Sequence, residues 1–210
     1  MNKVNAKKGF TLIELLIVIA ILAILATVTL LVLNPAQMFA QARDSQRISD
    51  LNTVKSAIAL YMSTASSPAL GTISETDYCA TYYWGTMATS SSAAALWGTG
   101  NLHVTWKDAS ATTTVGTTGW IPVALGDTPG GSPLSTLPMD PTNFNVSLNS
   151  NQTQTAAYYY ACSTTQTTFK LVGNMESQRY AKDGTDDKES TDGGTNAAYY
   201  ETGTNISADL

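Results

Sequence analysis

An uninterrupted apolar segment near the amino end constrains this chain more than any other feature. From Phe10 to Leu33, Glu14 is the only charged residue. At about 1.5 Å per residue, a helix over this segment is roughly 36 Å long, which is enough to cross the hydrocarbon core of a bilayer. We therefore expect residues 10–33 to form a membrane-spanning helix.

The residues before this segment do not follow the pattern of a secretory signal peptide. Lys3, Lys7 and Lys8 form a basic leader, and the small residue Gly9 comes before the apolar core. A secretory signal peptide has a shorter core with its small-residue cleavage site after it. Cleavage after Gly9 would remove residues 1–9 and leave the whole apolar helix on the product.

Glu14 is unusual in such a helix, because a carboxylate costs about 2.5 kcal/mol or more near the centre of a membrane span and less toward its ends. One interpretation is an interfacial residue that is protonated or reaches toward water. The other interpretation is that Glu14 pairs with a cation. Cleavage after Gly9 would create an ammonium on Phe10, which could meet Glu14 between staggered neighbouring chains. An isolated Glu14 in lipid would stay unsatisfied, so this pair would favour assembly.

The run Lys7-Lys8-Gly9-Phe10-Thr11-Leu12-Ile13-Glu14 resembles the class III signal of type IV pilins and type II secretion pseudopilins. The resemblance implies cleavage by prepilin peptidase between Gly9 and Phe10, and N-methylation of Phe10. It also implies that Glu14 guides subunits into a filament. The implied partners are the peptidase, an inner-membrane assembly platform and further copies of the chain.

The distribution of charge indicates how the chain is oriented. Three of its eleven basic residues lie in the leader, so the remainder carries eight basic residues against sixteen acidic ones. This balance argues against nucleic acid as a partner, because phosphate binding requires a basic surface. The positive-inside rule places the amino end in the cytoplasm and the domain outside. We expect a precursor in the cytoplasmic membrane and then an extracellular or envelope-spanning filament.

The two cysteines, Cys79 and Cys162, are expected to form a disulfide, since the compartment outside the membrane is oxidising. The alternative is two separate buried thiols that act as small hydrophobic groups.

A second helical segment is expected after an interruption at Pro35, which lacks an N–H group and crowds the preceding turn. Between residues 43 and 62 the larger apolar residues recur every three or four positions, as on one helical face: Ile48, Leu51, Val54, Ile58, Tyr61 and Met62. The charged residues of this segment occupy other faces. We expect exposed i,i+3 pairs there, Asp44 with Arg47 and Arg47 with Asp50, each contributing a few tenths of a kcal/mol.

The remaining chain is predicted to form a β-rich domain that packs on the apolar face of this amphipathic helix. Strands are expected over 78–84, 102–106, 156–162 and 169–174, with a short helix over 90–96 and extended or turn structure through the proline-rich residues 133–141. The predicted fold is α+β and pilin-like, a long amino-terminal helix packed against a small antiparallel sheet. The predicted parts are a leader (1–9), a membrane half (10–33), an amphipathic half (34–65) and a Ser/Thr-rich domain (66–210).

The acidic, glycine-rich tail contains four candidate calcium ligands, Asp183, Asp186, Asp187 and Asp192. Carboxylates on a turn-prone backbone suit Ca²⁺, although the spacing is not that of an EF-hand. Major pseudopilins bind calcium near the carboxy terminus, so the resemblance raises this expectation. The alternative is a solvated acidic loop. No cofactor is expected to be required.

Enzymatic activity is not expected. His103 is the only histidine, and no Gly-x-Ser-x-Gly, Walker or Rossmann pattern occurs. The leading hypothesis is a structural subunit of a type IV pilus-like filament, which the Ser/Thr-rich segment favours. The alternatives are a type II pseudopilin, which a calcium loop would favour, and a membrane-tethered monomeric binding module.

Overall fold

The computed structural model describes residues 9–71, 79, 84–86, 113–116, 119–142, 145–148, 152–155, 157–163, 165 and 167–206. The strand predicted over 102–106, the helix predicted over 90–96 and most of the strand predicted over 78–84 lie outside these residues. The chain divides into two compact units, Met1–Phe39 and Ala40–Leu210.

The first unit contains helix α1 (Leu12–Leu33), which ends where the sequence predicts an interruption. Asn34 adopts the left-handed conformation with φ 40°, a region that asparagine tolerates better than most residues. Helix α2 (Pro35–Thr64) then begins with Pro35 at its first position, where the missing N–H group costs no helical hydrogen bond. The predicted break at Pro35 is therefore confirmed.

Within the described chain, no large apolar side chain of α1 is buried; the exposed fractions run from 47% at Val18 to 83% at Leu12. By length and composition, the helical stretch Leu12–Thr64 contains a window that could cross a membrane. A helix that exposes apolar side chains on all sides requires lipid or other protein chains to cover it.

The second unit is built on a four-stranded antiparallel sheet in the order β1-β4-β5-β6. The strands are β1 (Trp84–Gly85), β4 (Tyr159–Cys162), β5 (Phe169–Gly173) and β6 (Tyr200–Gly203). A separate two-stranded sheet pairs β2 (Asn145–Leu148) with β3 (Gln152–Thr155), and a short 3-10 helix, η2, spans Leu125–Asp127. The predicted α+β class is confirmed. Strands β4 and β5 confirm two predicted strands, although β4 begins three residues later and β5 ends one residue earlier than predicted. Strands β2, β3 and β6 were not predicted.

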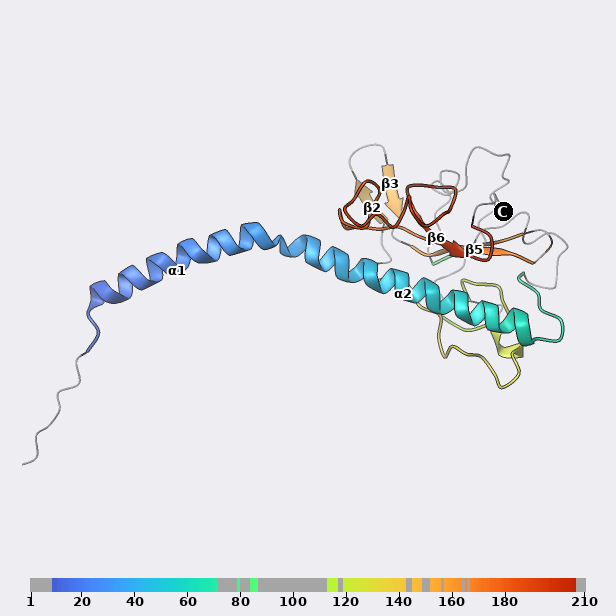
Figure 1. Cartoon of the computed structure of the whole chain (residues 1–210). Coiled ribbons are helices and arrows are strands. Elements are labelled where there is room, and N and C mark those ends of the chain that lie inside the picture. Colours follow the sequence, from blue (N-terminus) through green and yellow to red (C-terminus); the bar gives the residue numbers. More distant parts are fainter. Residues whose placement is uncertain are drawn as a thin grey trace, which may run out of the picture. The chain divides into compact units, whose positions relative to one another are not determined.

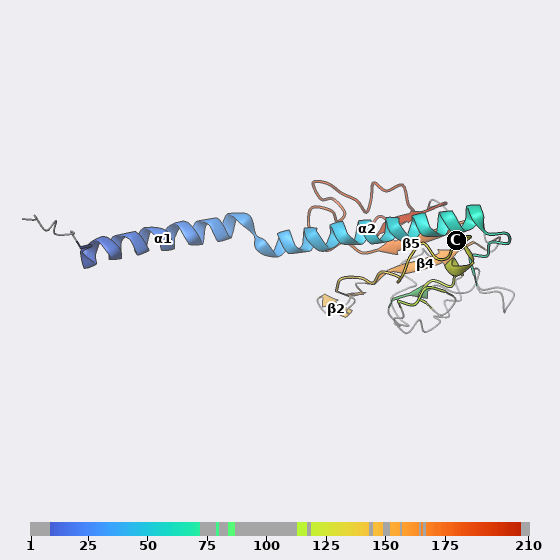
Figure 2. The same ribbon diagram turned by 90° about the horizontal axis from the view of Figure 1, so that it is seen from below.

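Helix α2 lies along the sheet, as Figures 1 and 2 show from two directions. The predicted apolar face makes this contact, since Leu51, Val54, Ile58 and Tyr61 are buried. At Gly173 the helix comes so near that an added Cβ would lie 3.0 Å from Leu51 Cδ1. The aromatic core consists of residues from β4, β5 and the preceding loops: Trp120, Tyr158, Tyr160 and Phe169.

The predicted disulfide is confirmed, because Cys79 and Cys162 are bonded to each other with their Cα atoms 4.8 Å apart. Cys162 is the last residue of β4 and is fully buried. The bond therefore ties a segment that precedes most of the domain to the centre of the sheet.

The prediction of exposed charged pairs on α2 is wrong. Asp44 and Arg47 are fully buried, and they do form an ion pair, with Arg47 Nη1 2.8 Å from Asp44 Oδ1. Asp50 accepts a hydrogen bond of 2.9 Å from Tyr158 Oη and takes no part in the contacts of Arg47 described below. The side chains of Asp44, Arg47 and Asp50 face the domain because the domain supplies hydrogen-bond and ion-pair partners for them.

Candidate assembly site and buried charge cluster

The predicted cleavage point lies just before α1, in residues without regular secondary structure. Phe10 is 87% exposed, and an added Cβ at Gly9 would meet no atom within 4 Å. The peptide bond between these residues is therefore accessible to an enzyme in the conformation that the structure describes.

Glu14 and Thr11 form a capping box at the start of α1. Glu14 Oε2 accepts hydrogen bonds from the Thr11 backbone N–H at 2.8 Å and from the Thr11 hydroxyl at 2.7 Å. In return, the backbone N–H of Glu14 donates to Thr11 Oγ1 at 3.3 Å. The two side chains thus satisfy polar groups that the first turn of a helix leaves without partners.

This arrangement corrects the expectation that an isolated Glu14 has no polar partner. The sequence contains the signal, because a threonine followed three residues later by glutamate before an apolar run is a capping-box signature. The cap does not use the amino group of Phe10, so cleavage after Gly9 would leave it intact. Glu14 therefore has a local role in addition to the assembly role that the sequence predicts.

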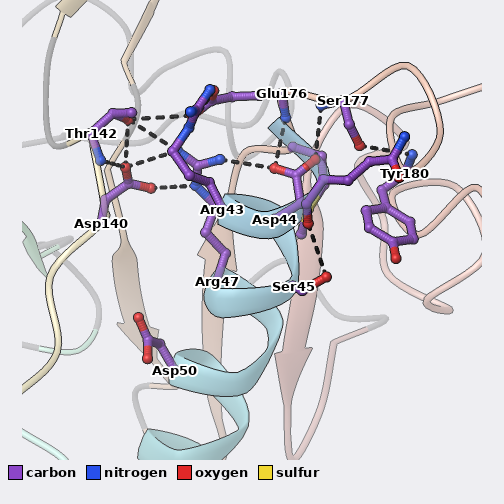
Figure 3. Close-up of polar contacts among 12 residues, drawn as sticks. Arg43, Asp44, Ser45, Arg47, Asp50, Asp140, Thr142, Glu176, Ser177 and Tyr180 are labelled. Atoms are coloured by element: carbon purple, nitrogen blue, oxygen red, sulfur yellow. Dashed lines mark hydrogen bonds and ion pairs between the residues drawn. The ribbon is translucent and has the colours of Figure 1, made fainter. Parts of the chain in front are cut away.

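A buried polar cluster surrounds Arg47, as Figure 3 shows. Its guanidinium donates to both carboxylate oxygens of Asp140, with Nε 2.6 Å from Oδ2 and Nη2 2.9 Å from Oδ1. It also contacts Glu176 Oε1 and the hydroxyl of Thr142. Arg43 joins the cluster through Glu176 Oε2, to which its Nε donates at 3.0 Å. Helix α2 is thereby connected to two segments that lie far away in the sequence.

Asp44 connects the same part of α2 to the chain that leaves β5. Its Oδ1 accepts the backbone N–H of Glu176 at 2.9 Å, and its Oδ2 accepts that of Ser177 at 2.8 Å. The preceding backbone N–H, that of Met175, donates to Glu189 Oε1 at 3.0 Å. Three consecutive backbone N–H groups are therefore bound by two carboxylates, one from α2 and one from the tail.

The cluster retains its charges despite burial. Burial alone disfavours the ionised forms of Arg47, Asp140 and Glu176, but the hydrogen bonds and opposite charges among them outweigh it. The pKa of Arg47 lies above its usual value, and the pKa values of Asp140 and Glu176 lie below theirs. The cluster is a set of mutually compensating ions that hold three segments together.

The acidic tail is folded by its own carboxylates. Asp187 accepts the backbone N–H groups of Asp183, Glu189 and Ser190, each at 2.9 Å. The Ser190 hydroxyl and these backbone groups lower the pKa of Asp187 to about 2. Asp192 likewise accepts the N–H groups of Gly194 and Glu201. These carboxylates of the tail are thus bound to the backbone of the tail and of the strand β6.

The four predicted calcium ligands are not brought together by this arrangement. Asp186 pairs with Lys188 at 2.8 Å and with Arg179 at 3.4 Å. In the part of the chain that the structure describes, no group of three or more His, Cys, Asp or Glu side chains is placed to hold a metal ion. Calcium binding stays a prediction.

Comparison with known proteins identifies one feature. Residues 4–30 match a family model described as the prokaryotic N-terminal methylation motif. No curated protein and no solved structure matches the chain.

Proposed function

Because residues 4–30 carry the N-terminal methylation motif, and with it a prepilin-type signal, we propose that the chain is a structural subunit of a type IV pilus-like filament. In this proposal, prepilin peptidase cleaves between Gly9 and Phe10, Phe10 is N-methylated, and an inner-membrane platform assembles the product. The observation that carries the proposal is the motif at the head of an apolar helix.

The exposure of α1 supports polymerisation. Its apolar side chains are suited to lipid in the precursor, and once the helix leaves the membrane only other protein chains can replace that lipid. Packing between copies of α1 would provide this cover. The domain of residues 40–210 has its own buried core, and a subunit can therefore carry it outside the membrane without refolding.

Glu14 retains an oxygen for a contact between subunits. Thr11 occupies Oε2, and among the described residues no hydrogen bond to Oε1 is present. The ammonium of Phe10 on a neighbouring copy would bind at Oε1 while the capping box holds the carboxylate in place. The Glu14–Phe10 pair is then a contact that only an assembled filament provides.

Two alternatives share the same signal. A pseudopilin of a type II secretion system would use identical processing and a short filament. A monomeric tethered module is favoured by one specific observation, the capping box, which gives Glu14 a use that requires no neighbour.

Processing is tested by mass spectrometry of the protein from its native membrane. The proposal expects a mature chain that begins with N-methylated Phe10 and has lost residues 1–9. Gly9→Val is the companion variant, because a branched side chain at Gly9 obstructs the peptidase; it should accumulate as uncleaved precursor. A mature protein that starts at Met1, or after a small residue beyond Leu33, would contradict the assignment.

A further inference from the structure

Lys170 on β5 and Glu201 on β6 form an ion pair that is shielded from water. Both side chains are 1% exposed, and Lys170 Nζ lies 2.9 Å from Glu201 Oε1. In the register of the two strands, Lys170 is opposite Gly203 and Glu201 is opposite Val172. Lys170 and Glu201 are therefore diagonal neighbours on one face of the sheet, a separation that long side chains can bridge.

Three consecutive residues of the tail hold this pair in place. The backbone N–H of Asn196 donates to Glu201 Oε2 at 2.8 Å, and Lys170 Nζ donates to the Thr195 hydroxyl at 3.1 Å. An added Cβ at Gly194 would collide with Glu201 Oε2, so the backbone of the tail packs directly on the carboxylate. The amine and the carboxylate are thus each fixed by a further contact.

The amine of Lys170 is also close to the carboxyl carbon of Glu201. Although Nζ contacts Oε1, this oxygen accepts no hydrogen bond within the described part of the chain. Because a C–O bond is about 1.2 Å long, Nζ can lie no more than about 4 Å from Cδ. Reacting atoms in a near-attack arrangement are about 3–3.5 Å apart, so a small movement of the lysine side chain would bring Nζ to that distance.

We propose that Lys170 and Glu201 condense into an amide that covalently links β5 to β6. The chain itself supplies both reactants, and the inference does not depend on the proposed filament function. Lys170 is the only buried lysine among the described residues. The other fully buried ion pairs described above are those of Arg47, and a guanidinium stays protonated and cannot act as the nucleophile.

The reaction releases one water molecule. A proton passes from the Lys170 ammonium to the Glu201 carboxylate across their contact, which gives an amine and a carboxylic acid. The amine lone pair attacks Cδ, a C–N bond forms and a C–O bond breaks. The hydroxyl group leaves as water with a proton from the nitrogen, and nothing is oxidised or reduced. Burial favours the product, because an ion pair is costly to hold away from water and an amide is uncharged.

The amide keeps the polar contacts of the ion pair and secures an edge of the sheet. Its N–H donates to Thr195 in place of the ammonium, and Glu201 Oε2 continues to accept from Asn196. Strand β6 lies at the end of the strand order, where it has one neighbouring strand, β5. Weakly held segments open locally more often than the core of a sheet. The disulfide of Cys162 anchors β4, and the amide anchors β6.

Peptide mapping of the full chain from its native membrane tests for this bond. After denaturation, reduction and digestion with trypsin, the linked chain should yield residues 108–179 joined to residues 189–210, without cleavage after Lys170. The joined species should be lighter than the sum of the two peptides by one water molecule. Its fragment spectrum should place the link between Lys170 and Glu201.

Separate peptides, with cleavage after Lys170 and an unmodified 189–210 peptide, would overturn the proposal. A link to another residue of the tail, such as Asp192, would overturn the choice of Glu201. These peptides do not include the amino terminus, and the map requires no filament. A negative result therefore leaves the proposed function intact, and a failure of the proposed function leaves this test unchanged.

Two lysine substitutions identify the nucleophile. Lys170→Arg keeps a cation beside Glu201 but removes the amine, so its 189–210 peptide should be recovered unlinked. Lys182→Arg makes the same change at an exposed position of the tail and should retain the link. A linked 189–210 peptide from Lys170→Arg would contradict the role of Lys170. If Lys170→Arg does not fold, the peptide map of the parent chain decides by itself.

Discussion

Arg47 and Asp140 are 93 residues apart in the sequence and form a two-point ion pair in the fully buried interior, with donor–acceptor distances of 2.6 and 2.9 Å. The pair joins the amino-terminal part of α2 to the proline-rich segment 133–141, which contains Asp140. Because Ala40 is the first buried residue of α2, this cluster lies where the helix first contacts its domain. It therefore fixes the register of α2 on the sheet at that end.

Arg47→Met should destabilise the chain by about 3–5 kcal/mol, because it leaves the carboxylates of Asp140 and Asp44 buried without their cation. Arg179→Met is the matched control. The ion pair of Arg179 with Asp186 is exposed, so this substitution should change the free energy of unfolding by no more than about 1 kcal/mol. Urea unfolding of the detergent-solubilised full chain, followed by tryptophan fluorescence, measures both. If Arg47→Met lowers the free energy of unfolding no more than Arg179→Met does, the cluster is not stabilising.

The position of Arg47 also shows what the sequence could not predict. Helical spacing correctly placed Leu51, Val54 and Ile58 on the face toward the sheet, because burial of apolar residues follows a local periodicity. The same spacing pointed Arg47 to solvent, since its partners Asp140 and Glu176 come from segments about a hundred residues away. Long-range ion pairs leave no periodic signal in a single sequence.

Strand β6 was missed for a similar reason. Its sequence, Tyr200-Glu201-Thr202-Gly203, lies in a polar, glycine-rich tail and contains a glutamate, which strands disfavour. Glu201 is nevertheless buried, because Lys170 on the adjacent β5 lies 2.9 Å from it. Strand β6 is therefore stabilised by its pairing with β5, which supplies the cation for Glu201. By contrast, the processing signal and the membrane segment each follow from residues that are close together in the sequence. The disulfide was predicted because the chain has two cysteines and its domain is expected in an oxidising compartment.

Glu189 should make stability depend on pH. Burial raises its pKa to about 7, from 4.5 in an unfolded chain, and Asp187 and Asp44 add to this shift. Two backbone N–H groups, those of Met175 and Lys182, oppose it. The folded state therefore binds this proton more tightly than the unfolded state, and stability should rise as the pH falls from about 7 to about 4.5.

Below that window the trend should reverse. The pKa values of Asp140 and Glu176 are lowered in the folded chain, so protonation of these groups at acidic pH removes stability. Tm measured from pH 4 to pH 8 should pass through a maximum on the acidic side. Glu189→Gln removes one titrating group and should flatten the slope between pH 4.5 and 7. A variant with the parental slope would contradict this role.

The Cys79–Cys162 disulfide closes a loop with a sequence separation of 83. In the chain-entropy model its removal by paired Cys→Ser changes should cost roughly 4 kcal/mol, measured as a lower midpoint of urea unfolding. Non-reducing peptide mapping of protein from the native source should recover the two cysteine peptides as one linked species. Free thiols at both positions would be the contrary result.

Filament yield from Glu14→Gln is the measurement that bears most directly on the proposed mechanism of assembly. Glutamine retains the capping box, since it too can accept from Thr11, but it removes the charge that would bind the Phe10 ammonium. Glu14→Ala removes both. With processing and membrane levels equal to the parent, sheared filaments counted by electron microscopy should be lost or nearly lost in Glu14→Ala and clearly reduced in Glu14→Gln. Parental filament numbers from Glu14→Gln would show that Glu14 acts only as a helix cap, and that its charge does not drive assembly.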